Sequence, residues 1–282
     1  MNYYKFIEAY DNCNNPLLEQ GNDVLPKSYL NILKLDRGQQ YTYRLPGFES
    51  VSVVLTGQAD ITVDDMEFPN VGQRKDIWSG QADSVYAGID STVAITAKMD
   101  GTEIAVAGGA YDQPLQSFRI TPDEVYLVDV GSNETKSRRR IYHITGHNTQ
   151  GRTGNLLVSE LYCDEGCWSG YPPHKHDTEN PPNETEFEEI YHYRFNPETG
   201  FGGQFCFLDD RDRTAFMTRH GDTFCFRRGY HPTVVSPGHA EYIFTVLVGV
   251  HQRSLVQNFE EKHRYLMNKI PGINNMTAKF KG

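Results

Sequence analysis

Short apolar and alternating stretches, separated by glycine turns, run through the first half of the chain. Residues 52–55 and 59–63 flank Thr56-Gly57 and predict a β-hairpin. Residues 91–97 are rich in β-branched side chains and end at the turn signal Met99-Asp100-Gly101, after which residues 103–107 resume the pattern. Strands recurring at intervals of about 8–12 residues are typical of a β-sandwich or barrel.

The second half repeats this pattern. Alternating or nearly continuous apolar runs predict further strands at residues 156–162, 189–195, 203–207, 223–226 and 242–248. Between the two halves, residues 131–140 are polar, end in three arginines and form the best candidate linker. Only residues 254–268 have the composition of a helix. We therefore predict an all-β protein with two β-rich halves and a short C-terminal helix.

Charge and composition exclude several classes of protein. The 282 residues include 27 Lys and Arg against 37 Asp and Glu, a net charge of −10, which argues against nucleic acid or an anionic membrane as a partner. No run approaches the roughly 18 apolar residues of a membrane-spanning helix, and the first residues do not resemble a signal peptide. The five cysteines are odd in number and irregularly spaced, so we expect reduced thiols and a cytoplasmic location.

Histidine is confined to the second half, where all ten copies lie between His143 and His263. His174 and His176 stand two residues apart, so on an extended strand both imidazoles point to the same face. His231 follows a glycine turn. A carboxylate is available downstream, at the candidate positions Glu184, Glu186, Glu188 and Glu189. Three imidazoles and one carboxylate suit one divalent ion per chain, zinc first, with manganese, iron, nickel or cobalt as alternatives.

The order His-x-His, Glu, His resembles that of the cupin superfamily. Residues 166–177, G-C-W-S-G-Y-P-P-H-K-H-D, more closely resemble the signature of the 5-deoxy-glucuronate isomerase family of myo-inositol catabolism. That family continues with E-x-Y-Y-x-R, a Gln on the next strand and G-Y-H-P, which are matched here at residues 189–194, at Gln204 and at residues 229–232. The sister family, 4-deoxy-L-threo-5-hexosulose-uronate ketol-isomerase, has a shorter gap before its Glu.

The resemblance implies a fold, a reaction and a ligand set. It implies two tandem cupin-like barrels (a bicupin), with residues 1–135 forming a degenerate barrel without metal and residues 136–282 forming the metal-binding barrel. The implied ligands are His174, His176, Glu189 and His231. The implied reaction is a metal-dependent aldose–ketose isomerisation of 5-deoxy-D-glucuronate, a small anionic sugar acid, to 5-dehydro-2-deoxy-D-gluconate. Assembly into a homo-oligomer is expected, because paired sheets cover each other's edges.

Two other functions remain open at this point. The chain could be a different cupin metalloenzyme acting on a sugar acid, such as a uronate ketol-isomerase or a dioxygenase, or a non-catalytic sugar-binding cupin. For the isomerase, the expected acid/base candidates are Tyr191, Tyr193 and Glu188. Residues expected to bind substrate are Arg194, Gln204, Tyr230 and Lys175, although strand parity places Lys175 and Arg194 on the face opposite the ligands.

Overall fold

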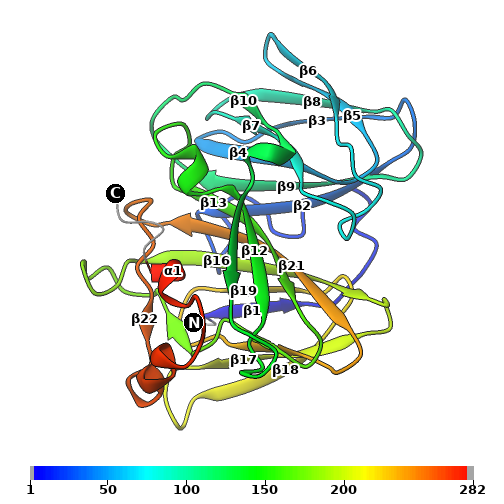
Figure 1. Ribbon diagram of the computed structural model, residues 1–282. Coiled ribbons are helices and arrows are strands. Elements are labelled where there is room, and N and C mark those ends of the chain that lie inside the picture. The colour runs from blue at the N-terminus through cyan, green and yellow to red at the C-terminus, as the bar shows by residue number, and fades with distance from the viewer. Residues whose placement is uncertain (1–2, 278–282) are drawn as a thin grey trace. The chain divides into compact units, whose positions relative to one another are not determined.

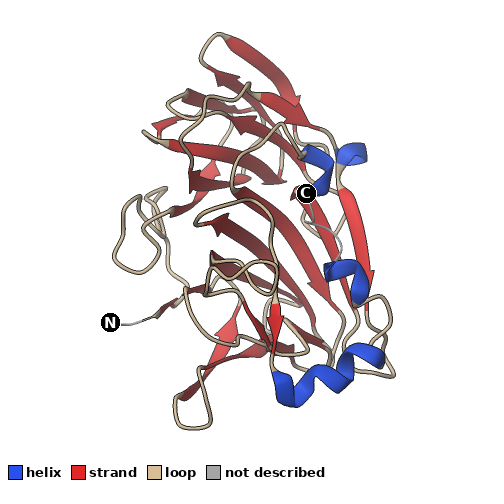
Figure 2. Cartoon of the chain, turned by 90° about the vertical axis from the view of Figure 1, so that its left-hand side faces the viewer, coloured by secondary structure: helices blue, strands red, loops and turns tan. Residues whose placement is uncertain are grey.

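The computed structural model describes residues 3–277, and β-strands dominate it (Figures 1 and 2). The prediction of an all-β protein is confirmed. The chain divides into two compact units, neither of which is one continuous segment. One contains residues 11–126 and 144–158, and the other contains residues 3–10, 127–143 and 159–277. No helix among the described residues is long and apolar enough to cross a membrane.

This division differs from the split that we expected between residues 135 and 136. The N-terminal strand β1 (Tyr4–Ile7) joins the second unit, because it pairs with β19 (Thr223–Phe226). Residues 144–158 join the first unit, where the backbone N–H groups of Gly154 and Leu156 donate to the buried carboxylate of Glu49, each at 2.7 Å. In both cases, a split at residue 135 would separate backbone groups that are hydrogen-bonded to each other or to a buried carboxylate.

The unit formed by residues 11–126 and 144–158 contains two sheets. The five-stranded sheet has the order β10 (Phe118–Ile120), β7 (Asp83–Ala87), β4 (Phe48–Thr56), β9 (Thr102–Ala110), β2 (Ser28–Leu35). The four-stranded sheet has the order β3 (Gln40–Arg44), β8 (Thr92–Ala97), β5 (Ala59–Val63), β6 (Met66–Val71). Two short 3₁₀ turns complete the unit, η1 (Pro122–Glu124) and η2 (His147–Thr149).

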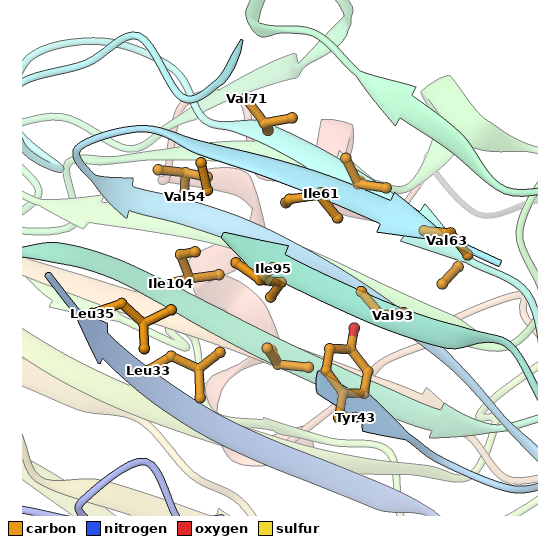
Figure 3. Close-up of a cluster of buried hydrophobic side chains, with 14 of the residues drawn as sticks. Leu33, Leu35, Tyr43, Val54, Ile61, Val63, Val71, Val93, Ile95 and Ile104 are labelled. Atoms are coloured by element: carbon orange, nitrogen blue, oxygen red, sulfur yellow. The ribbon is translucent and has the colours of Figure 1, made fainter. Parts of the chain in front are cut away.

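The predicted hairpin of residues 52–63 is wrong, although both of its strands exist. Strand β4 pairs with β7 and β9 in one sheet, whereas β5 pairs with β6 and β8 in the other. Gly57, at φ 83°, turns the chain from one sheet into the next. Apolar side chains of both sheets then meet in one core, in which Val54, Ile61 and Ile104 are at most 1% exposed (Figure 3). Burial of this apolar surface is what holds the two sheets together.

The second unit contains the predicted metal-site residues and is built from three sheets. The seven-stranded sheet has the order β1, β19, β16 (Phe187–Asn196), β21 (Ala240–Gly249), β13 (Leu156–Cys163), β12 (Arg139–Thr145), β11 (Tyr126–Val130). The four-stranded sheet has the order β14 (Trp168–Ser169), β20 (Thr233–Val235), β17 (Phe201–Phe207), β18 (Arg213–Arg219). The two-stranded sheet pairs β15 (His174–Lys175) with β22 (Asn258–Phe259).

The core of this unit is aromatic and includes Tyr191, Tyr193, Phe195, Phe224 and Phe226. After β22 the chain forms the 3₁₀ segment η3 (Glu261–Asn268) and the single helical turn α1 (Asn274–Thr277). The predicted C-terminal helix is therefore confirmed, but it starts later than residue 254, because β22 first pairs with the His-x-His strand.

Candidate metal centre

Three predicted ligands converge inside the second unit. His174 lies on β15, and His176 is the first residue after that strand. His231 follows the turn at Gly229, which has φ 94°. Their candidate ligand atoms all lie within 4.8 Å of one another. The side chains are almost completely buried, with exposed fractions of 3%, 3% and 1%. These histidines form a group that can hold a metal ion.

Glu189 completes the group from strand β16. Its Oε2 lies 2.8 Å from His176 Nε2 and 3.4 Å from His231 Nε2, and the residue is 4% exposed. Of the other carboxylates considered from the sequence, Glu184 forms an ion pair with Lys175 and Glu186 forms one with Arg227. The structure therefore brings together all four residues of the expected ligand set.

Backbone carbonyls fix the orientation of each imidazole. Nδ1 of His174 lies 3.3 Å from the carbonyl oxygen of Pro172, and Nδ1 of His176 lies 3.2 Å from that of Phe187. Nδ1 of His231 lies 2.9 Å from the carbonyl oxygen of Gly229. A carbonyl can only accept, so each Nδ1 carries a proton, and the Nε2 atoms of His174 and His231 present lone pairs to the centre. The Nε2 of His176 instead donates to the Glu189 carboxylate as long as no metal takes its place.

The protonation of the group fits a cation. Burial lowers the pKa of His231 well below its ordinary value and lowers that of His174 to about 3, with the neighbouring imidazoles adding to both effects. Burial also acts to lower the pKa of His176, but the Glu189 carboxylate outweighs it and raises that pKa. His231 Nε2 is buried and makes no hydrogen bond. A divalent metal ion can coordinate both the unpartnered lone pair of His231 Nε2 and the buried carboxylate beside it.

Tyr191, one of the expected acid/base residues, also reaches this centre. Its ring centroid lies 6.3 Å from that of His231. Burial raises the pKa of Tyr191 well above its ordinary value, and the charge of Glu189 raises it further. The phenol therefore stays protonated near neutral pH and is equipped to donate a proton or a hydrogen bond.

Tyr193 and Gln204 are hydrogen-bonded to each other, and Gln204 also contacts the backbone of the ligand His231. The Tyr193 hydroxyl donates to Gln204 Oε1 at 2.6 Å. Gln204 Nε2 donates to the carbonyl oxygens of Phe205 at 2.7 Å and of His231 at 3.0 Å. Both amide ends of Gln204 are thus used inside the protein, and we assign it to holding the His231 segment rather than to binding substrate.

Glu188 and Arg194 lie away from the centre. Both are an odd number of residues from Glu189 on strand β16, and alternate residues of a strand point to opposite faces. Arg194 Nε lies 3.1 Å from His192 Nε2, and its Nη1 lies 3.2 Å from His220 Nε2. Burial raises the pKa of Cys225, and the negative charge of Glu188 raises it further. This placement does not support the expected roles of either residue.

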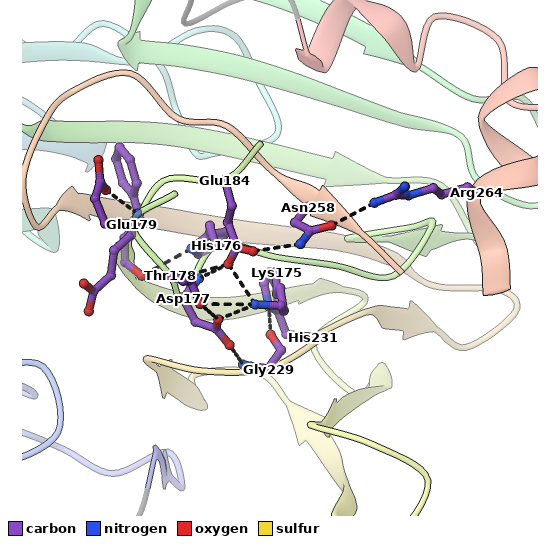
Figure 4. A network of polar contacts seen from close by, with 12 residues as sticks. Lys175, His176, Asp177, Thr178, Glu179, Glu184, Gly229, His231, Asn258 and Arg264 are labelled. Atoms are coloured by element: carbon purple, nitrogen blue, oxygen red, sulfur yellow. Dashed lines mark hydrogen bonds and ion pairs between the residues drawn. The ribbon is translucent and has the colours of Figure 1, made fainter. Parts of the chain in front are cut away.

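Lys175 belongs to a polar network that braces the ligand segments (Figure 4). Its ammonium forms ion pairs with Asp177 and with Glu184, the latter at 2.9 Å. Asp177 Oδ2 accepts from the backbone N–H of Gly229 at 2.9 Å, which links the His-x-His segment to the turn before His231. Lys175 is therefore a structural residue.

Tyr230, the remaining expected substrate contact, stacks its ring on Phe207, with 5.2 Å between centroids. Its phenol is half-buried, and burial raises its pKa. Tyr230 thus packs against β17, whereas the neighbouring His231 points its imidazole into the centre.

Gln257 is a residue at the centre that the sequence did not indicate. Its Nε2 lies 3.0 Å from His174 Nε2, and its buried Oε1 has no hydrogen-bond partner. Pairing of β22 with β15 places Phe259 opposite His174 and so brings this distant segment to the ligands. No local pattern marks the residue, because the contact spans 83 positions.

The fold and the buried histidine–carboxylate group define a cupin-like protein with a site that can hold a metal ion. An IolB-like protein from Salmonella typhimurium LT2 is structurally similar, with a TM-score of 0.81, 28% identity, and coverage of 94% of this chain and 99% of that one. Oxalate decarboxylase from Bacillus subtilis shares the fold, with a TM-score of 0.61, 12% identity, and coverage of 90% and 78%.

Sequence comparison identifies the family. The KduI/IolB family model matches residues 11–266, so the chain belongs to the KduI/IolB family. A 5-deoxy-glucuronate isomerase of Bacillus licheniformis is 29% identical, covering 89% of this chain and 92% of its own length. The protein of that name from Halalkalibacterium halodurans is 31% identical, with coverage of 77% and 80%. The resemblance drawn from residues 166–177 is thereby confirmed.

Proposed function

We propose that this protein is a metal-dependent isomerase that converts 5-deoxy-D-glucuronate to 5-dehydro-2-deoxy-D-gluconate in myo-inositol catabolism. The observation that carries the proposal is the buried group of His174, His176, His231 and Glu189, in a chain whose relatives are named 5-deoxy-glucuronate isomerase. The four residues would hold one divalent ion, zinc first and manganese, iron, nickel or cobalt as alternatives.

The reaction turns an aldehyde at C1 and a hydroxyl at C2 into a hydroxyl at C1 and a ketone at C2. One hydrogen moves from C2 to C1, and one proton moves from the C2 oxygen to the C1 oxygen, so no external oxidant or reductant is needed. When bound, the metal supplies a Lewis acid that polarises the carbonyl group. The ring of Phe226 packs against that of His231, with 4.1 Å between their centroids, and so gives this side of the site an apolar wall.

Tyr191 is the residue of this chain best placed to handle a proton. Its phenol lies beside Glu189 and keeps its proton, so it can donate to an oxygen that gains negative charge. Tyr193 is excluded from this role because its hydroxyl is committed to Gln204. We assign Tyr191 as the acid, and Tyr191→Phe is expected to lower kcat more than it raises KM.

The test is metal analysis of the purified protein together with a turnover assay on 5-deoxy-D-glucuronate. Near one metal per chain with formation of the ketose acid supports the proposal. Metal with turnover only of 4-deoxy-L-threo-5-hexosulose uronate assigns the sister activity within the family. Iron with oxygen uptake on a sugar acid indicates a dioxygenase, and sugar binding without turnover indicates a binding protein.

Two further expectations belong to this proposal. All five cysteines are free thiols in the structure, which suits a reducing cytoplasm. Assembly into a homo-oligomer is tested by light scattering of the purified chain.

A further inference from the structure

Arg139 is a fully buried cation for which the described part of the chain offers no anion. The residue is 0% exposed and forms no ion pair with a described carboxylate. Nη1 donates to the carbonyl oxygen of Ser137 at 3.0 Å, and Nη2 donates to that of Tyr171 at 2.8 Å. Nη2 also lies 3.3 Å from the sulfur of Met276, whereas Nε has no hydrogen-bond partner.

The two arginines that flank Arg139 in the sequence each have a carboxylate partner. Arg138 forms an ion pair with Asp129, and Arg140 forms one with Asp164 at 3.1 Å. Their side chains are 30% and 42% exposed. Arg139 alone of these three consecutive arginines is buried and without a carboxylate partner.

The guanidinium lies in the neighbourhood of the metal centre. Its Nη2 donates to the carbonyl oxygen of Tyr171, three residues before the ligand His174 in the same segment of the chain. Burial lowers the pKa of Arg139 itself to about 10, so it remains charged at neutral pH. Glu241, a buried carboxyl of the same unit, does not pair with it, because neither oxygen of the Glu241 carboxyl has a hydrogen-bond partner.

We propose that Arg139 binds the carboxylate of the substrate and thereby selects sugar acids over neutral sugars. A buried, unpaired cation is costly, and its retention is explained when the ligand supplies the missing anion. The free Nε–H donor permits charge-assisted hydrogen bonding to a carboxylate, the pairing for which a planar guanidinium is suited. This inference rests on the proposed function and names the residue that recognises the acid end of the substrate.

The alternative is a purely structural Arg139 that anchors Tyr171 and the C-terminal turn. The two roles separate in a comparison of ligands, because a structural residue affects charged and neutral ligands alike. The probes are D-glucuronate and D-glucuronamide, which differ only in the carboxylate, with binding to the zinc-loaded protein measured by calorimetry. The variants are Arg139→Gln and Arg139→Lys, with Arg140→Gln as the matched control, and each is checked for zinc content and melting temperature.

The wild-type protein is expected to bind the acid about 100-fold more tightly than the amide. Arg139→Gln is expected to abolish this preference, Arg139→Lys to reduce it about tenfold because lysine lacks the planar fork, and Arg140→Gln to retain it. Absence of any preference in the wild type overturns the inference, as does an undiminished preference in Arg139→Gln. If Arg139→Gln does not fold, an undiminished preference in Arg139→Lys overturns it instead.

The same samples separate this inference from the proposed function. An Arg139-dependent preference without turnover of 5-deoxy-D-glucuronate refutes the isomerase and leaves the carboxylate site in place. Turnover of 5-deoxy-D-glucuronate, together with a preference for the acid that does not depend on Arg139, supports the isomerase and refutes the role of Arg139 in binding the carboxylate.

Discussion

Replacing Gln204 with leucine tests whether the residue positions the metal centre. The side chain is 0% exposed, accepts from Tyr193 and donates to the carbonyl oxygens of Phe205 and His231. Leucine has a similar volume but leaves these three buried polar groups without their partner. An unsatisfied buried group costs about 1–3 kcal/mol, and partial relaxation brings our expectation to about 3–5 kcal/mol of unfolding free energy. Loosening of His231 is expected to weaken metal binding by about 10- to 100-fold.

Stability is measured by urea denaturation of the metal-free protein, and metal affinity by competition with a chromophoric chelator. Tyr193→Phe is the matched control, because it removes the hydroxyl that donates to Gln204 Oε1 and leaves the donation from Gln204 to His231 intact. We expect this control to lose about 1–2 kcal/mol and to keep its metal affinity. A Gln204→Leu protein that is destabilised but binds metal like the wild type would refute the positioning role.

Three further predictions concern the same unit. His176→Ala and His231→Ala are expected to fold but to lose metal and turnover, and full metal content in both would contradict the ligand assignment. Gln257→Ala removes the hydrogen bond that competes with metal for His174 Nε2, so metal affinity should rise about 2- to 10-fold in the chelator assay. Weaker binding would instead make Gln257 a contributor to metal binding. Burial raises the pKa of Glu241 from 4.5 to about 8, so its contribution to stability is full below pH 4.5 and is lost as the pH rises to about 8. The loss of unfolding free energy is at most about 5 kcal/mol, and Glu241→Gln should remove it. The check is urea denaturation of the wild type and of Glu241→Gln at pH 5 and pH 8. Equal pH dependence of the two proteins would contradict the prediction.

The second unit is organised around a centre to which distant segments contribute. The network of Lys175, Asp177 and Glu184 ties the His-x-His strand to the turn before His231, and Asn258 on β22 donates to Glu184 at 2.8 Å. The C-terminal segment is thereby fastened to the ligand strand. Because these contacts are charged or hydrogen-bonded and largely buried, we expect the ligands to keep their arrangement before a metal arrives.

The two-residue period of a strand predicts which face of the strand a side chain occupies, but not how far along the strand that side chain lies from the metal centre. Tyr191 and Tyr193 share a face of β16, as alternation predicts, yet only Tyr191 lies beside Glu189 and His231. Two residues along a strand cover about 7 Å, which is enough to leave the centre. The same parity correctly placed Lys175 and Arg194 on the far side from the ligands.

The sequence by itself determined the features that local geometry decides. Alternation of apolar residues specified strands, and the spacing of His174 and His176 specified two imidazoles on one side, because both follow from the two-residue period of a strand. Only the tertiary structure decided the pairing partners. It separated β4 from β5 into different sheets, brought Gln257 to His174, and buried Arg139 between two arginines that reach solvent. These outcomes depend on contacts between residues far apart in the chain, which no local pattern encodes.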